Sequence, residues 1–166
     1  MRFAIEVLSE IRRQVGGDFV VGARISGDEF TRGGLRAADM AEIARRLAVS
    51  GLIDFLSIIG GGAHTYELQA AAVPNMSYAT GVYVPLAAAI KQASPQTPIF
   101  HASRIVDPVH ADRTVAAGHV DVVGMTRALI ADPDLPRKAR EGRLDDIRTC
   151  VGANEGCIDR IYQGSR

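Results

Sequence analysis

The chain has 166 residues, of which 47% are hydrophobic and 23% are charged, a balance typical of one globular domain. Lysine plus arginine and aspartate plus glutamate each number 19, so no excess of positive charge favours binding to nucleic acid or to an anionic membrane. No apolar run reaches the roughly 20 residues of a membrane-spanning helix, and charges interrupt the opening MRFAIEVLSEIRRQVGG, where a signal peptide has an apolar core. We therefore expect a cytoplasmic protein.

Helices and strands alternate along the sequence. The opening stretch predicts a helix because apolar residues recur every three or four positions until Gly16 and Gly17. The apolar, valine-rich run FVVGARI is too short for a core helix and predicts a buried strand. The further predicted helices are 35–51, 83–93 and 109–118, and the further predicted strands are 52–59, 97–103 and 120–125. A last helix is expected from about Pro133 to Arg140, with Asp132 as its N-cap.

Four strands that are apolar on both faces and alternate with helices predict a parallel sheet covered by helices, which is the α/β class. Two architectures fit this order of elements. A doubly wound sheet usually has the pattern GxGxxG after its first strand, and GARISG lacks that spacing. A TIM (β/α)8 barrel needs about eight strands and roughly 250 residues, so this chain provides the material for half of one.

Ligands of parallel α/β folds bind at the carboxyl ends of the strands. Arg24 lies on the first predicted strand, and Arg104 and Arg127 follow the third and fourth. The last two arginines each come after a small polar residue, Ser103 or Thr126, and before a turn. Backbone amides in a tight turn and the planar fork of an arginine suit the oxygens of a phosphate. The spacing therefore indicates a phosphate site after the last two strands.

Each of these residues, taken singly, also has a purely structural interpretation. Arg24 could form an ion pair with Asp28 or Glu29, and the other two arginines could be solvated residues of the rim. The triplet GGG after the second strand is typical of a flexible start to a long loop. His64 and His101 lie near strand ends, but a lone histidine is more often a hydrogen-bonded rim or core residue. We therefore name neither histidine as catalytic.

Four segments carry a family resemblance: FVVGARISGDEF, DFLSIIGGG, HASRIVDP and VDVVGMTRALIADPDLPRKAREGR. In this order they resemble the old yellow enzyme family of FMN-dependent oxidoreductases, in the branch with trimethylamine dehydrogenase, 2,4-dienoyl-CoA reductase and bacterial N-methyl amino acid demethylases. The most specific part is GMTRALIADPDL followed by RTCVGANEGC. The resemblance implies that residues 1–149 are the C-terminal half of an FMN-binding barrel.

The resemblance also implies roles for six residues by position. They are Arg24, Ser103, Arg104, Gly124, Thr126 and Arg127. Arg24 would face the flavin pyrimidine and stabilise the negative charge that develops near N1 and O2 on reduction. Ser103 belongs to the first phosphate turn, where many relatives have glycine; the backbone amide is retained. Arg127 would be the charged partner of the phosphate in the second turn.

The end of the chain, residues 150–166, resembles the start of the iron–sulfur loop of the cluster-bearing branch. That loop has the pattern Cys-x2-Cys-x3-Cys, followed by a later fourth cysteine. Cys150 and Cys157 match the first and third positions of an incomplete metal motif, and Ala153 occupies the second. A [4Fe–4S] cluster needs four thiolates, and this chain has two cysteines. We expect two reduced thiols here and no iron–sulfur cluster.

In the amine-oxidising branch the implied reaction is hydride transfer from an N-methyl carbon of a small amine or amino acid to FMN. Water then splits the iminium into formaldehyde and the demethylated amine. The alternatives are NAD(P)H-dependent reduction of an activated alkene, a barrel enzyme for a phosphorylated sugar that needs no flavin, and a non-catalytic half barrel. We expect the groups that bind substrate and donate a proton to lie in the other half.

Four βα units alone leave two exposed sheet edges and an uncovered sheet face, and exposed edges promote association. We therefore expect a fragment or a split family member that forms a homo-oligomer or pairs with a complementary half barrel.

Overall fold

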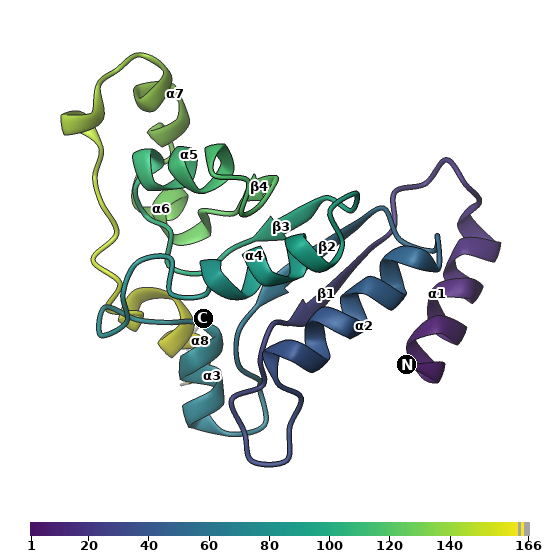
Figure 1. The fold of residues 1–166 in the computed structure, drawn as a ribbon. Helices are drawn as coiled ribbons and strands as arrows, with labels where there is room; N and C mark the ends of the chain where they lie inside the picture. Colours follow the sequence, from purple (N-terminus) through teal and green to yellow (C-terminus); the bar gives the residue numbers. More distant parts are fainter. Residues whose placement is uncertain (163, 165–166) are drawn as a thin grey trace.

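The computed structural model of the chain describes residues 1–162 and 164. A four-stranded parallel sheet lies at its centre, with the strands in the order β1-β2-β3-β4 (Figure 1). The strands are β1 Gly22–Ser26, β2 Phe55–Ile59, β3 Ile99–His101 and β4 Val122–Val123. Spatial order follows chain order, whereas a doubly wound sheet reverses its order at a switch point. The α/β half-barrel prediction is confirmed, with strands shorter than the apolar runs suggest.

Helices connect the strands and continue beyond the last one. The longer helices are α1 Arg2–Val15, α2 Ala37–Val49, α4 Val84–Ala93 and α5 Pro108–Ala116, and they confirm four predicted helices. The shorter elements are α3 Tyr66–Ala72, α6 Thr126–Ala131, α7 Leu135–Arg140, η1 Leu144–Asp146, η2 Glu155–Asp159 and α8 Arg160–Tyr162. Within residues 1–162 and 164, none of the helices is both long and apolar enough to span a bilayer.

The main core lies between the sheet and the two helices α2 and α4, which run side by side over one sheet face (Figure 1). Alternate residues of a strand point to opposite faces, so Leu56 and Ile58 of β2 enter this core together. Both side chains have an exposed fraction of 0%. The other buried members are Leu8, Val21, Ala44, Leu47, Ile53, Ala87, Ile90, Ile99 and Val120.

The opposite face of the sheet is the one that becomes the interior when a barrel closes. Strand register places Arg24, Ser57, Phe100 and Val122 in one row across the four strands. Phe55 stacks on Phe100 with ring centroids 4.4 Å apart. This face therefore carries side chains of mixed character, and they are partly or fully exposed.

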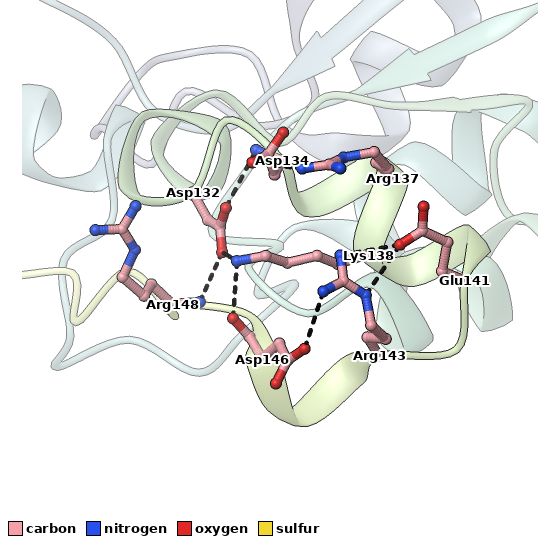
Figure 2. Close-up of polar contacts among 8 residues, drawn as sticks. All are labelled: Asp132, Asp134, Arg137, Lys138, Glu141, Arg143, Asp146 and Arg148. Carbon is pink, nitrogen blue, oxygen red and sulfur yellow. Dashed lines mark hydrogen bonds and ion pairs between the residues drawn. The ribbon is translucent and has the colours of Figure 1, made fainter.

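A network of charged groups ties α7 and η1 to the segment that leads to the end of the chain (Figure 2). Asp132 is 1% exposed and accepts hydrogen bonds from Lys138 Nζ at 2.6 Å and from the backbone N–H of Arg148 at 2.9 Å. These bonds, that of Lys138 first, lower the pKa of Asp132 to about 2. Lys138 Nζ also donates to the carbonyl oxygen of Asp146 at 2.8 Å.

This network corrects the prediction of a helix that begins at Pro133 with Asp132 as its N-cap. The helix α7 begins at Leu135, and its N-cap residue is Asp134. The carboxylate of Asp132 does accept the backbone N–H of Asp134 at 3.1 Å, but it is also bound to Lys138. The chain therefore makes a further turn before the helix starts.

Candidate functional site

A pocket of about 510 Å³ lies at the carboxyl ends of the strands. Its lining includes all six residues predicted to bind the cofactor: Arg24, Ser103, Arg104, Gly124, Thr126 and Arg127. The rest of the lining is mostly aliphatic and includes Ile59, Pro74 and Ile130. The structure thus brings the predicted residues together in one place, while their binding of FMN stays a prediction.

The pocket carries an unbalanced positive charge. Arg24, Arg104 and Arg127 are its only charged lining residues among those that the structure describes. None of these arginines belongs to an ion pair within the described part of the chain. Three guanidinium groups without a carboxylate partner suit an anionic ligand.

Arg24 extends from β1 on the open face of the sheet. Its Nε donates a hydrogen bond to Ser57 Oγ at 3.2 Å, and its side chain is exposed. The nearby carboxylates are used otherwise: Asp28 lies 3.6 Å from Arg36 Nη1, and Glu29 accepts the backbone N–H of Leu35. The interpretation of Arg24 as an ion-pair partner of either carboxylate is therefore wrong.

Arg104 has a constrained backbone and a fixed guanidinium group. Its φ of 50° lies in the left-handed region, which non-glycine residues adopt at a cost of roughly 1–3 kcal/mol. Its Nε donates to the carbonyl oxygen of Tyr78 at 2.7 Å. A Cβ atom built on Gly152 would lie 2.2 Å from Arg104 Nη1. The absence of a side chain at Gly152 therefore leaves the space that the guanidinium group occupies.

Ser103, beside Arg104, is only 5% exposed, and its hydroxyl has no hydrogen-bond partner among the described residues. Gly124 lies against the neighbouring strand end, where an added Cβ would come within 2.8 Å of Ala102 Cβ. Its backbone N–H donates to the carbonyl oxygen of His101 at 2.8 Å. Close approach of the two chain segments thus requires glycine at position 124.

The two residues predicted to form the second phosphate turn, Thr126 and Arg127, lie instead at the start of a short helix. Thr126 and Arg127 are the first two residues of α6, a helix that the sequence pattern did not reveal because its six residues are too few to show a periodicity. Arg127 Nη1 donates to the carbonyl oxygen of Pro74 at 2.8 Å and to Asn154 Oδ1 at 2.6 Å.

The two histidines lie away from the pocket lining. His101 is buried on the helix side of the sheet, where its Nδ1 lies 3.0 Å from the carbonyl oxygen of Ile58. Burial lowers the pKa of His101. His64 is exposed in the loop before α3.

The glycine triplet after β2 is largely buried. Gly60 and Gly61 are buried, and an added Cβ on Gly60 would lie 2.7 Å from the ring of Tyr83. These two glycines therefore pack closely at the start of the loop, where a larger side chain has no room.

Residues 150–157, which we call the tail loop, were singled out in the sequence only as an incomplete metal motif, and sequence reasoning missed their place beside the pocket. Asn154 has a φ of 67° and donates from Nδ2 to the carbonyl oxygen of Val73 at 2.9 Å. The carbonyl oxygen of Gly152 accepts the backbone N–H of Met76 at 2.8 Å. The string GANEG could have indicated a tight turn here, since asparagine tolerates the left-handed conformation and glycines flank it. Its partner, the loop of residues 73–78, lies far away in the sequence and showed no pattern.

The two cysteines of the tail loop lie in different surroundings. Cys150 packs against the apolar cluster of Val106, Ala128 and Leu135. Cys157 lines the pocket, and its thiol donates to the carbonyl oxygen of Asn154 at 3.5 Å. Across the described ranges, no group of three or more histidine, cysteine, aspartate or glutamate residues is placed to hold a metal ion.

Comparison with known proteins finds relatives that match almost the whole chain. The chain is 49% identical over 164 residues to N,N-dimethylglycine/sarcosine dehydrogenase of Chromohalobacter salexigens, covering 99% of the chain and 23% of that protein. It is 45% identical to the probable N-methylproline demethylase of Rhizobium meliloti, covering 99% of the chain and 24% of that protein. The chain thus spans about a quarter of the length of these relatives.

A solved structure of 2-naphthoyl-CoA reductase in complex with 2-naphthoyl-CoA superposes with a TM-score of 0.88 at 34% identity, covering 99% of the chain and 24% of that protein. The family model of the NADH:flavin oxidoreductase / NADH oxidase family matches residues 1–146. With the barrel strand order, the pocket at the strand ends and this match over most of its length, the chain belongs to the NADH:flavin oxidoreductase / NADH oxidase family.

Proposed function

We propose that this chain forms the phosphate and pyrimidine side of an FMN site in an oxidoreductase that demethylates a small N-methylated amine or amino acid. The observation that carries this proposal is the set of three arginines that share one pocket and have no carboxylate partner. A phosphate monoester has a charge of about −2 at pH 7, so it complements this pocket.

The phosphate is proposed to bind between the segments that follow β3 and β4. These are the last two strands of the sheet, and barrels often bind phosphate with the loops after their last two strands. Ser103 and Arg104 provide one side, and Gly124, Thr126 and Arg127 provide the other. The aliphatic lining residues offer an apolar wall for the rest of the ligand.

FMN, when bound, supplies the acceptor for the hydride that leaves the substrate carbon. Arg24 is proposed to face the pyrimidine ring, because it lies in the same pocket on β1, at the far side from the two phosphate segments. Its guanidinium charge would stabilise negative charge on that ring. The described pocket lining contains no carboxylic acid, histidine or tyrosine, so the proton donor is proposed to come from outside this lining.

The relatives favour amine oxidation as the reaction. Those at 49% and 45% identity are named for dimethylglycine, sarcosine and N-methylproline, which are all N-methylated amino acids. The solved relative at 34% identity is named as a reductase of an aromatic CoA thioester, which keeps alkene-type reduction as a second candidate.

Binding of FMN and of riboflavin, which lacks the phosphate, tests the proposal. The purified chain is expected to be yellow and to bind FMN more tightly than riboflavin. Arg104→Ala and Arg127→Ala should each weaken FMN binding by about 10- to 100-fold, which corresponds to about 1.5–3 kcal/mol for a charge-assisted hydrogen bond, and leave riboflavin binding unchanged. Arg113→Ala, an exposed residue of α5 outside the pocket, is the control. A colourless chain that refuses added FMN would contradict the proposal.

We further infer that this chain holds its tail loop in place without an iron–sulfur cluster. Asn154, Gly152 and the 73–78 loop already connect it to the pocket by hydrogen bonds. Anaerobic incubation with iron and sulfide is therefore expected to add no visible cluster absorbance. Stoichiometric uptake of iron and sulfide would show that the inference is wrong.

We also propose that a second copy, or a complementary half barrel, covers the open side of the sheet. The outer edge of β1 has no partner strand among the described residues. On α1, Phe3 is 80% exposed, and Val7, Ile11 and Val15 continue the same apolar stripe at a spacing of four residues. Analytical ultracentrifugation should give a mass above that of the 17.7 kDa chain. A stable, well-folded monomer would contradict this proposal.

A further inference from the structure

All three arginines of the pocket are held by neutral acceptors. Arg24 donates to the hydroxyl of Ser57, Arg104 to the carbonyl oxygen of Tyr78, and Arg127 to the carbonyl oxygen of Pro74 and the amide of Asn154. A neutral acceptor fixes the direction of a guanidinium group without cancelling its charge. A carboxylate in the same place would form an ion pair and compete with an anionic ligand.

Arg127 is the most completely fixed of the three. Both of its hydrogen bonds to the protein use Nη1, at 2.8 Å to Pro74 and 2.6 Å to Asn154. Its Nε and Nη2 make no hydrogen bond within the described part of the chain. These two nitrogens form one edge of the planar fork that can bind two oxygens of a phosphate together.

Asn154 is itself held from both sides. Its Nδ2 donates to the carbonyl oxygen of Val73 at 2.9 Å, and its backbone carbonyl oxygen accepts the N–H of Cys157 at 3.2 Å. The Nδ2 bond fixes the amide so that Oδ1 points to Arg127. Asparagine can also adopt the φ of 67° at this position more easily than most residues. The side-chain amide of Asn154 is therefore held through both its nitrogen and its oxygen, and its residue type suits its left-handed backbone.

We propose that Asn154 is a positioning residue for the bound phosphate: it anchors Nη1 of Arg127 as a neutral acceptor and leaves the Nε–Nη2 edge for the ligand. This inference rests on the proposed FMN site and extends it to the tail loop. The tail loop therefore contributes to cofactor affinity through Arg127, while Asn154 itself need not touch the ligand.

The sharpest test is Asn154→Asp. The substitution keeps the size of the side chain and an oxygen that can accept from Arg127, but it places a negative charge beside the guanidinium group. We expect FMN binding to the full 166-residue chain to weaken at least about tenfold and riboflavin binding to stay within about twofold of the wild type. Asn154→Gly, which keeps the left-handed backbone and removes the amide, should shift the ratio of the two affinities in the same direction.

The matched control is Asn75→Asp. Asn75 lies in the 73–78 loop, and its Oδ1 accepts hydrogen bonds from the N–H and hydroxyl of Ser77 without contacting a pocket arginine. FMN affinity of this variant should remain within about twofold of the wild type. An equal loss in Asn75→Asp and Asn154→Asp would overturn the inference, because it would show a general effect of added negative charge.

The outcomes separate the inference from the proposed function. Equal weakening of FMN and riboflavin in the Asn154 variants would show a purely structural role and overturn the inference while the FMN site stands. Unchanged FMN affinity in both variants would also overturn it. A wild-type chain that binds FMN no better than riboflavin would instead refute the phosphate site itself, and with it any role of Asn154 in that site. Circular dichroism of each variant checks that the fold is retained.

Discussion

On β2, Leu56 and Ile58 are fully buried against the helices, whereas Ser57 and Ile59, on the opposite face, remain partly exposed. The same strand thus contributes to two regions with different chemistry. The covered face is apolar and closely packed, and the open face leads to the pocket with its three arginines. This difference predicts that substitutions on the covered face change stability and that those on the open face change ligand binding.

Ile58 and Ile59 allow the most direct test, because they are neighbours of the same residue type on opposite faces. Ile58→Ala should lower the free energy of unfolding by about 2–5 kcal/mol, because the Ile58 side chain is 0% exposed and its truncation leaves a cavity in the core. Ile59→Ala should cost about 1 kcal/mol or less, because the side chain is only partly buried and lines the pocket. Urea unfolding of both variants measures the two values. Equal losses would mean that the two faces contribute equally to stability.

The buried carboxylate of Asp132 should make a pH-dependent contribution to stability, away from the pocket. Its pKa is lowered from 3.8 to about 2 in the folded chain, chiefly by its hydrogen bond with Lys138. A lowered pKa in the folded state stabilises the fold above the unfolded pKa, and that contribution disappears as the pH falls through the folded value. The difference in unfolding free energy between wild type and Asp132→Asn should therefore be full above about pH 4 and shrink towards about pH 2.

The control for this prediction is Asp134→Asn. Asp134 has a side-chain exposure of 56% and pairs with Arg137 on the surface. Exposed ion pairs contribute little to stability, so this variant should unfold almost like the wild type across the same pH range. A similar pH-dependent loss in both variants would show that the hydrogen bond between Asp132 and Lys138 is not the cause.

Gly152 lies where the tail loop meets the pocket, and two effects oppose a side chain there. Its φ is +76°, and an added Cβ would lie 2.2 Å from Arg104 Nη1. Gly152→Ala should therefore lower the unfolding free energy by about 1–2 kcal/mol and also weaken FMN binding, because Arg104 must move. Gly156→Ala is the control in the same loop, since an added Cβ there meets no atom within 4 Å. Unchanged FMN affinity in Gly152→Ala would show that Arg104 does not need its present position.

The covered face could be predicted from sequence because its signals are local. Apolar periodicity located α1, α2, α4 and α5, and the valine- and isoleucine-rich runs located all four strands. Among the helices that were missed, α3 and α6 have seven and six residues, which is too short for a repeating apolar pattern. The sequence places the start of α7 too early because Asp132 has the residue type of an N-cap, whereas its bond with Lys138 leaves no linear pattern.

The pocket was predictable only in part. Its six predicted residues lie on a strand or follow one, so the rule that parallel strands bring their carboxyl ends together placed them in one region. Asn154 is hydrogen-bonded to Val73 in the loop of residues 73–78, and the two residues are 81 positions apart in the sequence. Such a long-range hydrogen bond leaves no periodicity or composition signal in a single sequence. The supports of the arginines could therefore be found only in the structure.

The smallest expected effect on stability concerns Arg24, on the open face. Arg24→Gln removes one hydrogen bond between exposed groups, so its unfolding free energy should stay within about 0.5 kcal/mol of the wild type. If Arg24 faces the flavin pyrimidine, loss of its charge should lower the reduction potential of bound FMN, because negative charge on the reduced ring is then less stabilised. FMN and riboflavin affinities should change together, in contrast to Arg127→Ala. Spectroelectrochemical titration measures the potential, with Ser57→Ala as the control that removes the acceptor of Arg24 and retains its charge. An unchanged potential in Arg24→Gln would place the pyrimidine ring elsewhere in the pocket and leave the two phosphate segments as the part of the site that this chain defines.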